Sequence, residues 1–119
     1  MRVHVDAAPP LVKARFDAGD ALDHTNARIA REEICAALIP GGRLILDFGT
    51  VRSIDSGGVG ALVAVLKAVR RGGGRMVLIG LHPQVLSELK TIRLTTVFEI
   101  LPDEAAAIIA LETTPVTSR

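Results

Sequence analysis

The chain of 119 residues is long enough for one domain with a hydrophobic core and too short for two domains of ordinary size. Hydrophobic residues make up 49% of it and charged residues 23%, a balance that excludes an intrinsically disordered chain. The 14 basic and 13 acidic residues leave a net charge of +1, and Trp and Tyr are absent, so nothing directs the chain to an anionic membrane or to direct nucleic-acid binding.

The N-terminal part of the chain predicts two strands. Apolar residues alternate with polar ones over residues 3–5 and again over residues 11–16, and this two-residue period is typical of half-buried strands. Residues 17–25 include Gly19 and several short polar side chains, which interrupt the pattern. We therefore expect a loop here, with Thr25 as the cap of the helix that follows.

A helix and a central strand are expected next. The helix begins at about Asn26 and ends at Pro40-Gly41-Gly42, because proline cannot continue it and glycine accepts the dihedral angles of the exit turn. Its apolar residues fall on one face, which we expect to be buried: Ala27, Ala30, Ile34, Ala37 and Leu38. The apolar run Leu44-Ile45-Leu46 is too short for a helix and indicates a strand that is covered on both faces.

The second half of the chain alternates helices and strands. Nearly every residue from Gly58 to Val69 is apolar, which gives this helix more apolar surface than one sheet face covers and leaves part of it for a partner protein. After it we expect a buried strand over 75–81, a short helix over 83–90, an edge strand over 97–100 and a final helix over 103–111 that runs through Ala106, Ile109 and Ala110. This alternation predicts parallel strand pairing with right-handed crossovers.

The cellular setting is predicted from what the chain lacks. Cys35 is the only cysteine, so the chain can form no internal disulfide and no cysteine cluster for a metal. The first residues lack the apolar stretch of a signal peptide, and no run is long enough to insert into and cross a bilayer. We therefore expect a cytoplasmic protein with no membrane insertion.

The segment Ile54-Asp55-Ser56-Gly57-Gly58-Val59-Gly60 joins a strand-like stretch to the apolar helix and allows two interpretations of Ser56. In the first, its hydroxyl caps the helix and the glycines permit a tight turn. In the second, Ser56 accepts a phosphoryl group, which adds about two negative charges where the helix dipole tolerates them. One modification would then abolish the docking of a partner on this helix.

Nucleotide binding and hydrolysis are weaker interpretations of the same segment. No lysine and serine or threonine follow in phosphate-loop spacing, and Val63 stands where the dinucleotide fingerprint has its third glycine. A hydrolase would use Ser56 as the nucleophile, His24 as the base and Asp23 to orient it, but only Gly58 of the two glycines of a nucleophile elbow is present.

Paired carboxylates and metal ligands are also weakly indicated. Asp23 and Asp55 each precede a turn or a helix start directly, where capping is the commoner role of aspartate. The histidines His4, His24 and His82 are scattered without the spacing of metal ligands. We expect no metal site and no cofactor.

Several of these segments together resemble a known family. The strongest is Leu46-Asp47-Phe48 followed by residues 54–62, and the others are Leu22-Asp23 with Asn26-Ala27, and Gly73-Gly74 before Met76-Val77-Leu78. From about Lys13 to Leu111 the chain resembles a STAS domain of the anti-sigma factor antagonist type. The resemblance implies an α/β fold with a mixed central sheet of four to five strands and helices mainly on one side. We place the domain at residues 1–112 and expect a loose tail over 113–119.

The resemblance also implies a function by partner switching. The unphosphorylated antagonist would bind an anti-sigma factor that is a serine kinase, phosphorylation of Ser56 would release it, and a serine phosphatase would reset it. The residues expected to bind the partner are Asp23, Asp55, Ser56, Gly57, Gly58, Val59 and Val63. The protein itself would not be an enzyme. The alternative is a STAS subunit that is not phosphorylated, in a lipid-transporting ABC complex or a stressosome-type scaffold.

Two features depart from the family pattern. Gly57 stands where the commonest pattern has a second serine, so Ser56 is the one hydroxyl in the motif. The segment Gly19-Asp20-Ala21-Leu22-Asp23 is one residue longer than the usual loop.

Overall fold

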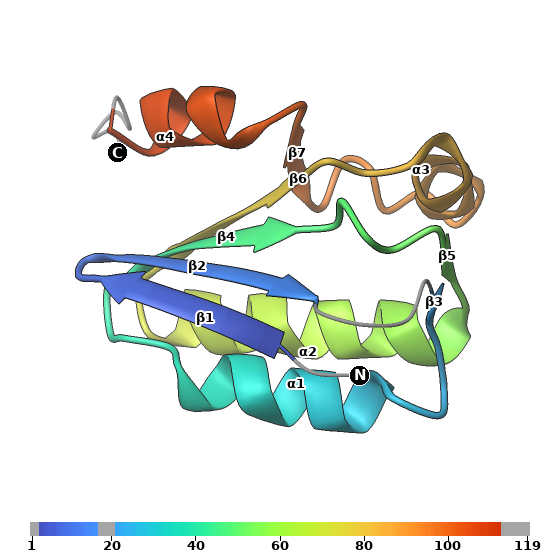
Figure 1. The fold of residues 1–119 in the computed structure, drawn as a ribbon, viewed down its shortest axis with the longest axis horizontal. Coiled ribbons are helices and arrows are strands. Elements are labelled where there is room, and N and C mark those ends of the chain that lie inside the picture. Colours follow the sequence, from blue (N-terminus) through green and yellow to red (C-terminus); the bar gives the residue numbers. More distant parts are fainter. Residues whose placement is uncertain (1–2, 17–20, 113–119) are drawn as a thin grey trace.

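The computed structural model describes residues 3–16 and 21–112. The expected tail over 113–119 and residues 17–20 of the expected loop lie outside the described residues. The elements follow in the order β1 Val3–Ala8, β2 Leu11–Phe16, β3 Ala21–Leu22, α1 Ala27–Ala36, β4 Arg43–Asp47, β5 Ser53–Ile54, α2 Ser56–Arg71, β6 Arg75–Ile79, α3 Pro83–Thr91, β7 Glu99–Leu101 and α4 Glu104–Glu112 (Figure 1).

Five of the strands form one mixed sheet in the order β1-β2-β4-β6-β7. β1 and β2 form an antiparallel hairpin, whereas β2, β4, β6 and β7 pair in parallel. The expected α/β class, the mixed sheet and the parallel pairing are therefore confirmed. The expected edge strand is β7, and the run Leu44-Ile45-Leu46 lies in β4, at the centre of the sheet.

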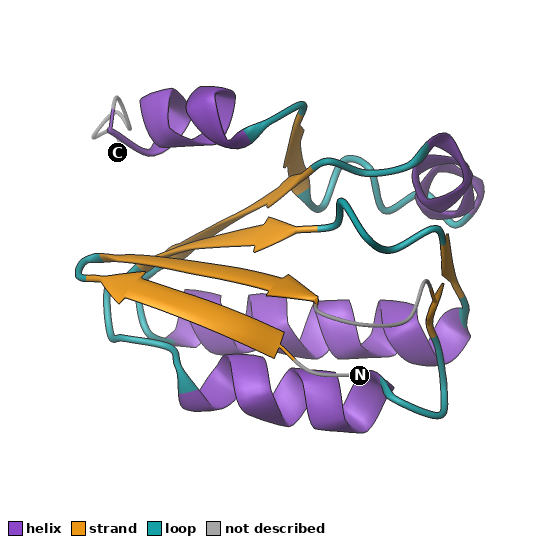
Figure 2. Cartoon of the chain, in the orientation of Figure 1, coloured by secondary structure: helices purple, strands orange, loops and turns teal. Residues whose placement is uncertain are grey.

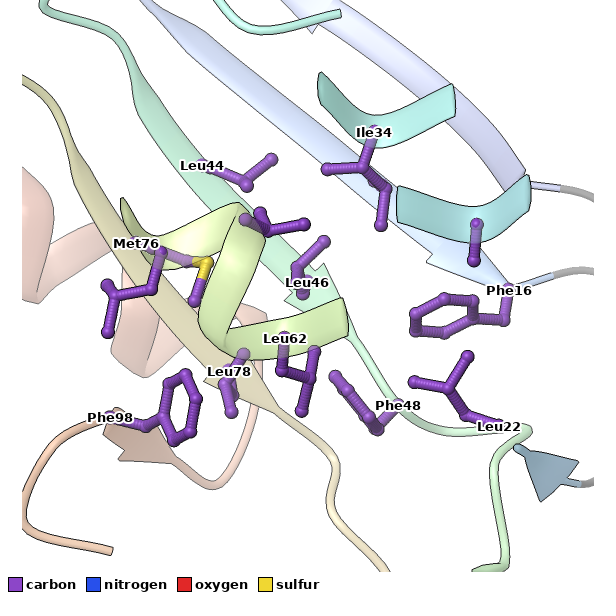
Figure 3. Packing of buried hydrophobic residues seen from close by; sticks show 14 of the residues in the cluster. Phe16, Leu22, Ile34, Leu44, Leu46, Phe48, Leu62, Met76, Leu78 and Phe98 are labelled. Atoms are coloured by element: carbon purple, nitrogen blue, oxygen red, sulfur yellow. The ribbon is translucent and has the colours of Figure 1, made fainter. Parts of the chain in front are cut away.

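The two faces of the sheet are covered by different helices (Figures 1 and 2). α1 and α2 lie side by side on one face, over a core that includes Leu46 of β4 and Leu62 of α2 (Figure 3). In that core the rings of Phe16 and Phe48 meet edge to face, with centroids 5.1 Å apart. α4 covers part of the opposite face, where Ile45 is fully buried against a second apolar cluster.

Two sequence expectations about α1 are wrong in detail. α1 is preceded by Asn26 and not by Thr25, and the Asn26 side-chain oxygen accepts from the amide of Asp23 rather than from the helix. α1 also ends at Ala36, before the Pro40-Gly41-Gly42 turn. The amide and the hydroxyl of Thr25 both donate to the Asp23 carboxylate within the loop, which explains why the Thr25 side chain does not cap α1.

The final helix is present as expected, as α4, and the structure shows which of its sides is buried. Its buried residues are Ala107 and Leu111, whereas Ile109 is exposed. Because nearly every residue of this helix is apolar, the sequence has no stripe that indicates which side faces the sheet.

Candidate functional site

A short two-stranded sheet brings two distant loops together beside the start of α2. β3 pairs in parallel with β5, with Leu22 opposite Ile54, and the Asp55 amide donates to the Leu22 carbonyl oxygen at 3.3 Å. The residues that follow these two strands, Asp23 and His24 on one side and Asp55 on the other, are therefore neighbours. Two segments that are about 30 residues apart in the sequence form one site.

Asp55 is the cap of α2, and its carboxylate is fully engaged. Its Oδ1 accepts from the Gly58 amide at 3.0 Å, while its Oδ2 accepts from the His24 amide at 3.1 Å and lies 3.1 Å from Nδ1 of the His24 ring. The Gly58 amide, and after it the His24 side chain, lower the pKa of Asp55 to about 2. Asp55 is thus ionised at neutral pH and joins the two loops.

Ser56 is the first residue of α2 and is exposed. Within the described parts of the chain, its side chain makes no hydrogen bond. The interpretation of its hydroxyl as the helix cap is therefore wrong, because Asp55 holds that position. The Ser56 hydroxyl is open to solvent at the end of the helix where the dipole favours negative charge.

Glycine is required at positions 57 and 58 because neighbouring segments pack too closely there for a side chain, and not because the backbone conformation is unusual. A Cβ atom on Gly58 would lie 2.3 Å from the Leu22 carbonyl oxygen and 2.7 Å from Cγ1 of Ile54. A Cβ atom on Gly57 would lie 2.8 Å from Cα of His24. The serine that the family pattern has at this second position would therefore collide with the loop after β3.

The His24 ring is exposed, and its contact with Asp55 fixes one of its nitrogens. The hydrogen bond to Asp55 raises the pKa of His24, as does the charge of that carboxylate. The sequence placed His24 in a polar loop and missed this contact. The one available signal was that Leu22-Asp23 and the serine motif are both among the segments that resemble the family.

The arrangement does not assemble the three groups of a hydrolase. His24 pairs with Asp55 and not with Asp23, and no hydrogen bond joins it to Ser56 within the described residues. The Asp23 carboxylate instead accepts from the amide and hydroxyl of Thr25, which lower its pKa. Asp23 thus organises its own turn, and Asp55 caps α2 while also accepting from His24, which confirms the capping interpretation of these two residues.

The remaining residues of the expected docking surface lie along one side of α2. These are Val59 and Val63, which follow Ser56 at the spacing of one helix face, and Gly60, which was not among the expected residues, lies on the same face. Gly60 is exposed, and both valines are half-buried against the core. α1 and the sheet bury much of the apolar surface of α2, and the two half-buried valines are the part of the expected docking surface that stays accessible.

Two further observations concern metal and membrane binding. Among residues 3–16 and 21–112, no three His, Cys, Asp or Glu side chains gather into a group that could hold a metal ion. No helix in the same residues has the length and hydrophobicity needed to cross a bilayer.

Solved structures of other proteins have the same fold as this chain. A STAS domain protein from Planctomyces limnophilus, described as an anti-sigma-factor antagonist, matches with a TM-score of 0.85 and 16% identity, over 93% of this chain and 98% of that one. The anti-sigma factor antagonist SpoIIAA in its unphosphorylated form matches with a TM-score of 0.68 and 18% identity, over 96% and 100%.

A membrane protein contains the same fold. The murine anion transporter named solute carrier 26 family member A9 matches with a TM-score of 0.78 and 18% identity, over 92% of this chain but 19% of that one. At these identities the likeness shows the fold alone. A search of the curated proteins finds no match to this sequence. Residues 14–107, most of the chain, match the STAS domain family, and the protein therefore belongs to that family.

Proposed function

We propose that this protein is an anti-sigma factor antagonist that regulates sigma factor availability by partner switching. The observation that carries the proposal is the division of roles between two adjacent residues. Asp55 caps α2 and joins the loops, while the Ser56 hydroxyl is exposed and bonds to nothing in the described structure. A serine that has no structural role can be modified without cost to the fold.

Phosphorylation would change the docking surface strongly while leaving the helix intact. An anti-sigma factor with serine kinase activity would transfer the γ-phosphoryl group of ATP to Oγ of Ser56. The new O–P bond forms as the bond to ADP breaks, and a base of the kinase takes the hydroxyl proton. The product carries about two extra negative charges at the first turn of α2, where the dipole favours them. A phosphatase would hydrolyse the ester and restore binding.

The structure also supports a protein that acts by binding rather than catalysis. His24 is held by Asp55, and the two carboxylates of the site are occupied by backbone and side-chain donors. The partners that we propose, an anti-sigma factor kinase and a serine phosphatase, are cytoplasmic, and we place this protein with them. Labelling of Ser56 by an active-site phosphonate probe would contradict this view.

The test uses two variants of Ser56 as baits in a lysate of the native organism. Ser56→Ala cannot be phosphorylated, and Ser56→Asp carries a charge that the first turn of a helix accepts, so both should fold. We expect a histidine-kinase-like ATPase on the alanine bait and its loss from the aspartate bait. Ser87→Asp, an exposed serine on α3, is the matched control and should retain the ATPase. Equal affinity of the kinase for both Ser56 variants would refute the switch.

A second candidate function is a STAS subunit that is not phosphorylated, in a lipid-transporting ABC complex or a stressosome-type scaffold. The observation that favours a transport role is the fold match to an anion transporter of which this chain covers 19%. In the same experiment, transporter subunits retained equally by Ser56→Ala and Ser56→Asp would support this candidate.

A further inference from the structure

The groove between α1 and α2 begins beside Ser56 and continues along both helices. The two helices lie side by side and start at the same end of the domain (Figure 1). A hollow of about 270 Å³ near that end is lined by Arg28 and Arg31 of α1 and by Gly57 and Gly60 of α2. A second hollow, of about 240 Å³, is lined by Arg31, Cys35, Ala64 and Arg71. Arg31 borders both hollows, and we call them together the α1–α2 groove.

The rim of the α1–α2 groove is positively charged. Arg28, Arg31 and Arg71 are exposed along it, and Glu32 is the acidic residue that lines it. Glu32 is paired with Arg28 at 3.3 Å, whereas Arg31 and Arg71 have no ion pair within the described residues. Three arginines against one glutamate leave an excess of two positive charges on this strip, in a chain whose total is +1. Such a local excess attracts acidic groups.

We propose that the α1–α2 groove receives an acidic helix of the partner protein, an inference that rests on the proposed function for the identity of that partner. Arginine binds carboxylates through two parallel hydrogen bonds, so Arg31 and Arg71 can each hold a glutamate or aspartate of the incoming helix. Between these side chains the floor includes Gly60 and Ala64, whose small size lets another backbone approach, and a Cβ atom on Gly60 would meet nothing within 4 Å outside its own helix.

An acidic partner helix explains why phosphorylation of Ser56 would release the partner and not recruit it. Ser56 lies four residues before Gly60, on the same side of α2, so a phosphate on Ser56 stands at the entrance of the groove. Its charge has the same sign as that of the acidic helix and competes with it for the arginines. Phosphorylation therefore releases the partner by repulsion and by neutralising the basic rim.

The test measures binding of defined peptides to the full chain, without any cellular partner. The probes are alanine-rich helical peptides of about 20 residues with glutamate on one face, and matched peptides with lysine or glutamine at the same positions. Binding is followed by amide chemical shifts and by the rate at which maleimide labels Cys35, the one cysteine of the chain, which lies in the groove. We expect the glutamate peptide alone to shift the groove amides and slow the labelling, with a dissociation constant of about 1 mM or lower.

Two charge reversals decide whether the groove is responsible. Arg31→Glu should weaken the glutamate peptide about tenfold or more, since an attraction becomes a repulsion. Arg15→Glu is the matched control, because Arg15 is an exposed residue of β2 that alternates with the inward-facing Ala14 and therefore lies on the sheet face away from α1. It should bind the peptide as the unaltered chain does. Amide dispersion in the spectra verifies that both variants are folded.

The outcomes separate this proposal from the proposed function. If no glutamate peptide shifts the groove amides, or Arg31→Glu and Arg15→Glu bind it equally, the acidic-helix proposal is overturned even where Ser56→Asp releases the kinase. If the peptide binds in the groove but the kinase binds both Ser56 variants equally, the groove proposal stands and the phosphorylation switch fails.

Discussion

Gly58→Ala tests how tightly α2 begins against β3. The added methyl group would lie 2.3 Å from the Leu22 carbonyl oxygen and 2.7 Å from Cγ1 of Ile54. The nearer atom belongs to the backbone, so no side-chain rotation relieves the contact, and α2 must move away from β3. The Gly58 amide that donates to Asp55 is retained in the variant, so the steric effect is isolated from loss of the cap.

The two contributions to the free energy of unfolding have opposite signs. Replacing glycine by alanine inside a helix stabilises by about 1 kcal/mol. Inserting a methyl group into a packed contact costs about 1–3 kcal/mol, and we take the upper value because the contact is with backbone. Gly58→Ala should therefore lower the free energy of unfolding by about 2 kcal/mol.

Gly60→Ala is the matched control on the same helix. Apart from its own helix backbone and chain neighbours, a Cβ atom there would have no heavy atom within 4 Å, so only the helix propensity acts and the variant should gain about 1 kcal/mol. Urea unfolding followed by far-ultraviolet circular dichroism measures both, and Gly58→Ala should lower the midpoint by about 1 M. If Gly58→Ala is as stable as Gly60→Ala, α2 is not held against β3 and the reasoning is refuted.

Three further predictions address the site and the core. The Gly58 amide, and after it His24, lower the pKa of Asp55 to about 2, and the hydrogen bond to Asp55 raises the pKa of His24, so these interactions stabilise the fold fully between the ordinary values of 3.8 and 6.5. The stabilisation is lost as the pH falls toward about 2 or rises through the raised pKa of His24, and Asp55→Asn should return the pKa of His24, measured by NMR, toward its ordinary value. Glu99→Gln removes the ion pair with Arg75 between β7 and β6, and should lower the free energy of unfolding by about 1 kcal/mol, less at high salt. Leu46→Ala, in the centre of the sheet and fully buried, should cost about 3 kcal/mol in a urea titration, and a loss below 1 kcal/mol would contradict its place in the core.

The parts of the fold that the sequence predicts are those that local pattern determines. The run Leu44-Ile45-Leu46 has no polar residue and is too short for a helix, so a buried central strand was the one arrangement that fitted, and β4 is that strand. The sequence also predicts the long apolar helix and its end at the glycines that follow it. α2 ends at Arg71, directly before Gly72. The resemblance to STAS domains rested on the same segments, and the family match confirms it.

The cap of α2 could not be predicted from the sequence, because a contact between distant segments decides which of two suitable residues takes that position. Asp55 and Ser56 are both good helix caps, and the sequence alone offered capping as an interpretation of each. Pairing of β3 with β5 ends the strand at Ile54 and places the loop after β3 beside the next residue, so Asp55 both caps α2 and accepts from His24. No local pattern in the sequence contains that pairing.

This correction strengthens the case for a regulatory serine. If Ser56 were the cap, phosphorylation would remove a hydrogen bond that the helix needs, and the modified protein would be altered in fold as well as in surface. With Asp55 as the cap, the helix start depends on a carboxylate that is ionised throughout the physiological pH range. The neighbouring hydroxyl can then gain or lose a phosphate while β3, β5 and α2 keep their arrangement. We infer that phosphorylation changes the charge that a partner meets at Ser56 and leaves the fold around it unchanged. Ser56→Asp should therefore alter partner binding, while its urea midpoint stays within the error of that of the unaltered chain.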